Sequence, residues 1–168
     1  MAVTLAEAIH QLRELNEPVP KPMRLPAAAA VAAAERELGV TFHPDYRTFL
    51  LEASDVVYGT LEPATIGTRK RAHTDLVRMA HDAWTLMELP RELLPICEDN
   101  GDYYCMNERG EVVYWSHDGS EQPVSSLLHR GRTAPPRRGA DGLGPSAATD
   151  EHWPNLATWI QQVWIEEN

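Results

Sequence analysis

Acidic side chains are concentrated between residues 88 and 121, where nine acids stand against two bases and give a net charge of −7. Asp99 and Asp102 in this stretch have the type and spacing that general acid–base chemistry could use, but such chemistry also needs a pocket that shifts their pKa values and a group that orients a substrate. The sequence indicates neither, and it shows no nucleophile elbow at Ser125 or Ser126 and no glycine-rich phosphate loop. We therefore expect no enzyme, and we interpret the carboxylates as a solvated turn or as a rim that binds another protein.

Cysteine and histidine, the common metal ligands, are present but badly spaced for a site. Cys97, Cys105 and His117 contain no Cys-x-x-Cys pair, and His73 and His81 are eight residues apart, about two turns of a helix. We therefore expect no metal and no cofactor. The two cysteines flank an Asn-Gly turn, so we expect them to face each other across a hairpin, as free thiols in a reducing cytosol.

Three short strands are predicted to hold the acidic residues. Leu94, Ile96, Tyr104 and Met106 recur at period two, and residues 112–115 form a further apolar and aromatic run. Tight turns are expected at 99–101 and 108–110, where Asn and Gly tolerate positive φ. The pattern predicts a meander, half buried against helices, with these acids in water: Glu98, Asp99, Asp102, Asp118 and Glu121.

Helices are predicted around this meander. Apolar spacing of three and four residues indicates helices over 4–15, 26–39, from 44 onward and over 70–88, and Trp153-Pro154 opens a closing helix. The second and third helices are expected to form a hairpin that covers one side of the sheet. Residues 61–66 predict another strand, which Pro63 confines to a sheet edge or a strand start. The fold class is α+β, a mostly antiparallel sheet flanked by an N-terminal helical hairpin, a middle helix and a C-terminal helix.

Composition limits the partners and the compartment. The 168 residues, 43% of them hydrophobic, predict one domain spanning 1–168. With 15 basic and 25 acidic side chains the net charge is −10, which disfavours direct binding of nucleic acid and suits a basic partner, or serves solubility alone. No targeting segment or membrane span is evident, so we expect a cytoplasmic protein that binds no membrane.

Residues 129–152 differ from the rest of the predicted domain, since they are rich in proline and glycine and nearly free of large apolar side chains. A connection this long without periodicity is a functional loop or a disordered one. It carries a cluster of four arginines: Arg130, Arg132, Arg137 and Arg138. We expect the loop to be mobile and open to trypsin unless these arginines dock on the acidic rim.

Two blocks of the chain resemble the SMI1/KNR4, or SUKH, superfamily. The first is Glu35-Arg36-Glu37-Leu38-Gly39-Val40 followed by Pro44-Asp45-Tyr46-Arg47-Thr48-Phe49-Leu50. The second joins the 93–97 strand, the acidic turn, the Tyr-Tyr-Cys strand at 103–105 and a later run that ends in His117-Asp118. The chain departs from the family's pattern at 54–58, where many relatives carry a double glycine and Ser-Asp-Val-Val-Tyr stands here.

The resemblance implies an immunity protein of bacterial competition, which neutralises a cognate toxin, often a basic nuclease, by stoichiometric binding. The alternative that it implies is a regulatory or scaffolding module without catalysis, which would bind its partners through the 129–152 loop. Trp115 and Trp164 are expected to be exposed, because one lies in an out-of-phase run and the other at the margin of the last helix. The partner-binding candidates combine the acidic rim, the 54–58 turn and one aromatic residue: Asp55, Tyr58, Glu98, Asp99, Asp102, Trp115, Asp118 and Glu121.

Overall fold

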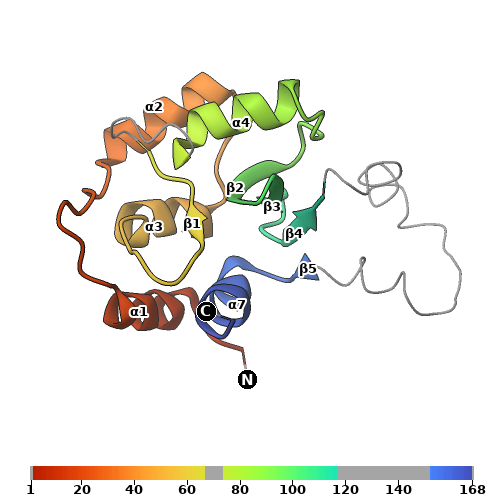
Figure 1. Ribbon diagram of the computed structural model, residues 1–168. Helices are drawn as coiled ribbons and strands as arrows, with labels where there is room; N and C mark the ends of the chain where they lie inside the picture. The colour runs from red at the N-terminus through yellow and green to blue at the C-terminus, as the bar shows by residue number, and fades with distance from the viewer. Residues whose placement is uncertain (1, 67–73, 117–151, 168) are drawn as a thin grey trace, which may run out of the picture.

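A five-stranded antiparallel sheet lies between helices in the structure (Figure 1), a computed structural model that describes residues 2–66, 74–116 and 152–167. Its strands follow one another in chain order: β1 (Glu62–Pro63), β2 (Leu94–Asp99), β3 (Asp102–Met106), β4 (Val112–Trp115) and β5 (His152–Trp153). The predicted meander is β2, β3 and β4, and the prediction is confirmed. Pro63 stands in an edge strand, as expected for a residue without a backbone N–H.

The turn between β2 and β3 is a two-residue hairpin turn. Asn100 and Gly101 adopt φ values of 54° and 93°, and positive φ at both central positions is typical of a type I′ turn. Asp99 and Asp102 therefore flank the turn and are paired directly across the two strands. The Asn-Gly sequence predicted this turn, because these two residues enter the left-handed region at the lowest cost.

The two cysteines do not face each other, and that prediction is wrong. A register irregularity between Pro95 and Cys97 pairs Cys97 with Tyr104 and leaves Cys105 opposite Pro95. Paired residues share a face of the sheet and neighbours along a strand alternate, so Cys97 and Cys105 point to opposite faces. Both are free and buried, and burial raises the pKa of both thiols.

Helices cover both faces of the sheet (Figure 1). They are α1 (Leu5–Leu15), α2 (Ala28–Leu38), α3 (Pro44–Ala53), α4 (Leu76–Thr85) and α7 (Leu156–Trp159), followed by the π-helix η3 (Ile160–Ile165). α4 packs on β2 and beside α2, whereas α1 packs against α3, α7 and η3. The expected α2–α3 hairpin exists, but its two helices also join different pairs, α2 with α4 and α3 with α1.

Helix ends follow the local signals in the sequence. α1 begins with a capping box, in which Thr4 and Glu7 each accept a backbone N–H of the other. α2 ends at Leu38, and its C-cap Gly39 adopts φ 72°. The same helix begins at Ala28, so Pro26 precedes it and does not occupy its first turn. α4 begins at Leu76 behind the cap Asp75, later than predicted.

The central strands are buried on both faces, rather than half buried as expected. Every residue from Leu94 to Cys97 and from Tyr103 to Met106 is buried. Helices lie on both faces of the sheet, so the residues between the period-two positions are covered as well. Trp115 is only 6% exposed and stacks on Tyr103 with ring centroids 6.1 Å apart, so its expected exposure is wrong.

The C-terminal segment differs from a simple helix. Trp153 lies in β5 and pairs with Val112, and α7 passes directly into the π-helix η3. The apolar side of this segment is buried and consists of Leu156, Trp159, Ile160 and Val163. Trp164, expected at the margin, is 1% exposed, because the wider turn of a π-helix brings it to the same side as Trp159, with ring centroids 6.3 Å apart. No helix within the described ranges is long and apolar enough to cross a membrane.

Candidate functional site

Carboxylates from three neighbouring strands gather at one end of the sheet. The register places Glu62 of β1 opposite Glu98 of β2, and Asp99 of β2 opposite Asp102 of β3. Like charges directly opposite each other in antiparallel strands are destabilising. We call these four residues the acidic end. Asp118 and Glu121, the other two acids predicted for this rim, lie outside the described residues.

Asp102 is held by a tyrosine of the next strand. The Tyr114 hydroxyl donates to Oδ2 of Asp102 at 2.8 Å. Burial, together with this hydrogen bond and the charge of Asp102, raises the pKa of Tyr114. Tyr114 is half-buried and its neighbour Trp115 is buried, so the tyrosine is the more exposed residue of the two.

Asp99 and Glu98 have different local roles. The Oε2 atom of Glu98 accepts the backbone N–H of Gly101 at 2.7 Å and so braces the hairpin turn. The carboxyl of Asp99 has a raised pKa, because it is partly desolvated and lies near Asp102 and Glu98. Neither Glu98 nor Asp99 forms an ion pair within the described part of the chain.

A shallow groove of about 200 Å³ opens at the acidic end, between β1 and the β2–β3 turn. Its lining combines three carboxylates with smaller and apolar groups: Thr60, Leu61, Glu62, Glu98, Asp99 and Asn100. Sequence reasoning found the second half of this lining and missed Thr60 to Glu62. The 61–66 strand was predicted, but nothing in the sequence showed that it would pair with β2 and bring Glu62 beside Glu98.

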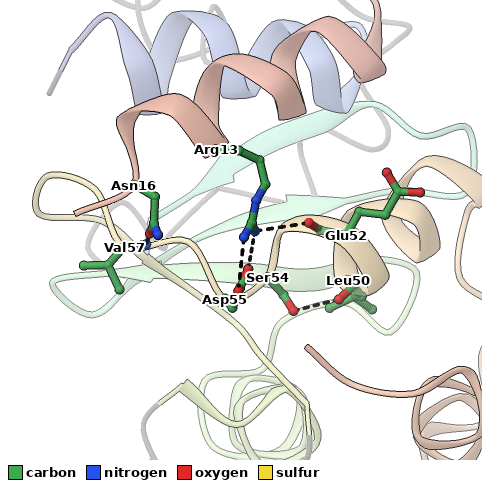
Figure 2. A network of polar contacts seen from close by, with 7 residues as sticks. All are labelled: Arg13, Asn16, Leu50, Glu52, Ser54, Asp55 and Val57. Atoms are coloured by element: carbon green, nitrogen blue, oxygen red, sulfur yellow. Dashed lines mark hydrogen bonds and ion pairs between the residues drawn. The ribbon is translucent and has the colours of Figure 1, made fainter. Parts of the chain in front are cut away.

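The 54–58 turn, a second candidate binding region, is fastened to the first helix (Figure 2). Arg13 donates to Oδ1 of Asp55 at 2.5 Å and to the carbonyl of Glu52 at 3.3 Å, and Ser54 Oγ donates to the carbonyl of Leu50 at 2.7 Å. The side chain of Asp55 is 17% exposed. Its carboxylate thus already has a partner inside the chain, and a role for Asp55 in partner binding stays a prediction.

Further hydrogen bonds fix the backbone of the same turn. The N–H of Val57 donates to Oδ1 of Asn16 at 2.8 Å, and its carbonyl accepts the N–H of Glu17 at 2.8 Å. The carbonyl of Tyr58 accepts Nε1 of Trp164 at 2.9 Å. Tyr58, a predicted partner-binding residue, is therefore half-buried in a turn that α1 and η3 hold from both sides.

The first block of motif residues serves the fold. Glu35 accepts the N–H of Phe42 at 2.7 Å and pairs with Arg47, so it joins α2 to α3. Tyr46 and Phe49 are buried in the core, which explains the spacing of this block without a binding role. Within the described ranges, no three residues among His, Cys, Asp and Glu are grouped so that they could hold a metal.

Comparisons with known proteins place the chain in a family. A family model described as SMI1-KNR4 cell-wall matches residues 5–127. A crystal structure of a protein from Pseudomonas syringae pv. tomato is 36% identical, with a TM-score of 0.73, and the match covers 96% of this chain and 98% of that one. No curated protein matches. The predicted resemblance is therefore confirmed, and the chain belongs to the SMI1/KNR4, or SUKH, family.

Proposed function

We propose that this protein is an immunity protein that binds a cognate toxin and neutralises it without catalysis, and that the acidic end is its docking face. The observation that carries the proposal is the pairing of Glu62 with Glu98 and of Asp99 with Asp102. Each pair sets two carboxylates against each other, and such pairs lower the stability of the free protein. A basic partner offsets this repulsion when it docks.

The charge of the partner follows from the charge of the face. The segment 88–121 carries −7 of the total charge of −10, so the field around the acidic end attracts cations. Nucleases bind phosphates with basic grooves, and an acidic protein that covers such a groove excludes the nucleic acid. Charge steering of this kind raises the association rate and favours the correct partner. A basic nuclease domain is the toxin class that fits.

Inhibition by covering the basic groove of the toxin requires no catalytic group in this chain. Glu98 is engaged by the turn amide of Gly101, and Asp102 by the Tyr114 hydroxyl. These contacts hold the two carboxylates in fixed positions at the acidic end. The two free, buried thiols are compatible with action in the reducing cytoplasm of the producing cell.

A regulatory or scaffolding module of the SMI1/KNR4 type is the second candidate, favoured by the description of the matching family model. Its proposed docking segment, residues 129–152, lies outside the described residues except for His152, so its mobility and its trypsin cleavage stay predictions.

Co-expression separates the two functions. The protein encoded beside this one is produced alone and together with this chain, and growth and co-purification are measured. An immunity protein restores growth and co-purifies with its toxic neighbour in a fixed ratio. A neighbour that is harmless alone, or a toxicity that this chain leaves unchanged, would contradict the proposal.

A further inference from the structure

Asn100 and Gly101, at the tip of the β2–β3 hairpin, form a dipeptide that is chemically reactive in water. An asparagine that precedes glycine loses its side-chain amide readily, because glycine has no side chain to hinder the ring closure that this loss requires. Among the 168 residues, Asn100-Gly101 is the one pair of this kind. Asn100 is exposed and lines the shallow groove, so water reaches its side chain.

Deamidation of such a pair begins at the backbone nitrogen of the glycine. Hydroxide removes the proton of this nitrogen, which then forms a bond to the side-chain Cγ of the asparagine. The bond from Cγ to the side-chain nitrogen breaks, and this nitrogen takes a proton from water and leaves as ammonia, which regenerates the hydroxide. Water opens the resulting succinimide ring at either carbonyl group, so the product is aspartate or isoaspartate.

The nitrogen that must react is held by a neighbouring carboxylate in the folded protein. The N–H of Gly101 donates to Oε2 of Glu98 at 2.7 Å, and hydrogen bonds to charged acceptors are stronger than neutral ones. A carboxylate is far too weak a base to remove an amide proton, so this contact keeps the proton on the nitrogen. The positive φ values of Asn100 and Gly101 fix the turn around it. The nitrogen therefore reacts only after the contact with Glu98 has opened.

We propose that Asn100 is a deamidation site, and that Glu98 restrains its reaction by holding the backbone nitrogen of Gly101. The reaction then proceeds from the fraction of molecules in which the turn has opened locally, so the folded protein reacts more slowly than the unfolded chain. Glu98 can act in this way because it lies in β2, where its backbone is paired with Tyr103 of β3.

Both products change the hairpin turn. Aspartate at position 100 adds one negative charge to the groove beside Asp99. Isoaspartate adds the same charge and also inserts a CH₂ group into the backbone, which a two-residue type I′ turn cannot accommodate without a shift of its strands. The direct pairing of Asp99 with Asp102 would then be displaced. An effect on the binding of a toxin rests on the proposed function, whereas the modification is a property of the free protein.

Mass spectrometry of the turn peptide, after incubation of the purified protein at mildly alkaline pH, measures the conversion. The wild type should convert slowly when folded and faster in urea. Folded Glu98→Ala should convert about 10-fold faster than the folded wild type, because a hydrogen bond to a charged group is lost. Glu98→Gln retains an oxygen that can accept the N–H and should stay closer to the wild type. Asn107, which precedes a glutamate in the next turn, is the internal control and should remain unconverted.

Two outcomes would overturn the proposal. One is that the wild type converts no faster in urea than when folded, and the other is that Glu98→Ala converts no faster than the wild type although its melting curve shows that it is folded. If Glu98→Ala does not fold, the comparison of the wild type in buffer and in urea still decides whether the turn restrains the reaction. No partner is present in these samples, so their failure would leave the proposed function standing, and a chain that gives no protection from a toxin could still deamidate as proposed.

Discussion

Arg13 of α1 donates to the carboxylate of Asp55 at 2.5 Å and joins the first helix to the turn that follows α3 (Figure 2). The pair is partly shielded from water, since the side chain of Arg13 is 38% exposed and that of Asp55 is 17% exposed. Arg13→Ala and Asp55→Ala should each lower the free energy of unfolding by about 1–2 kcal/mol, and the double variant should lose less than their sum. Urea unfolding measures this. Arg24→Ala, an exposed arginine, is the control and should change little; additive losses would contradict a direct interaction.

Gly110 is a second point where two distant elements meet. It adopts φ 85°, and a Cβ at this position would lie 2.6 Å from Nε2 of His43, the N-cap of α3. Gly110→Ala should therefore destabilise the fold by about 2–4 kcal/mol, combining backbone strain with overpacking. Gly39→Ala is the matched control, because Gly39 has φ 72° and open space around it, so about 1–2 kcal/mol of strain alone is expected. Equal losses in thermal melts would show that the His43 contact is unimportant.

Tyr46 carries a buried hydroxyl without a hydrogen-bond partner in the described structure. Burial raises the pKa of Tyr46, so this hydroxyl stays neutral. Tyr46→Phe should leave the free energy of unfolding unchanged or raise it, because it removes an unsatisfied polar group. Tyr114→Phe, which deletes a hydroxyl that donates to Asp102, should cost about 1 kcal/mol. If Tyr46→Phe proves the more destabilising of the two in chemical unfolding, the hydroxyl must have a partner.

The raised pKa of Asp99 predicts the direction in which acid changes the stability of the protein. A carboxyl whose pKa is raised on folding destabilises the fold while it is ionised, and this penalty disappears as pH falls through the raised value toward about 3.9. Asp99→Asn should therefore stabilise the protein at neutral pH by a few tenths to about 1 kcal/mol, with the gain fading in acid. Melting temperature against pH measures it.

The contribution of Glu111 to stability should depend on pH in the opposite direction, so Glu111 serves as the matched comparison for Asp99. Hydrogen bonds from Asn107 and Arg109 lower its pKa, with smaller help from the charges of Arg109 and His152. Its contribution is present above the ordinary glutamate value of about 4.3 and is lost as pH falls through the lowered value. Glu111→Gln should destabilise at neutral pH and not in acid. If the change in stability of Asp99→Asn and that of Glu111→Gln depend on pH in the same way, the environments described for these two carboxyl groups are wrong.

Local signals in the sequence predicted most of the fold. The Thr4–Glu7 capping box, Gly39 as a left-handed cap and the Asn100-Gly101 turn each follow from short-range chemistry, which depends on a few adjacent residues. The β2 irregularity at Pro95–Cys97 and the π-helix that buries Trp164 depend on packing between distant segments, and no local pattern marks them. For the same reason the acids of the turn were found and Glu62, brought in by strand pairing, was missed.

Association kinetics with the purified neighbouring protein, the proposed toxin, test the proposed docking face most directly. Glu62→Lys and Asp99→Lys are combined, because each new lysine faces an acid, Glu98 or Asp102, and the fold should be preserved or stabilised. The control combines Glu37→Lys and Glu52→Lys, exposed acids on α2 and α3 with the same change in charge.

Stopped flow measures the association rate of each variant across a range of salt concentrations, and a melting curve checks that each variant is folded. The account predicts that the acidic-end variant associates about 10-fold or more slowly at low salt and loses most of the salt dependence, whereas the control stays near the wild type. A folded acidic-end variant that associates as fast as the wild type, with the same salt dependence, would contradict the claim that this end of the sheet receives the toxin.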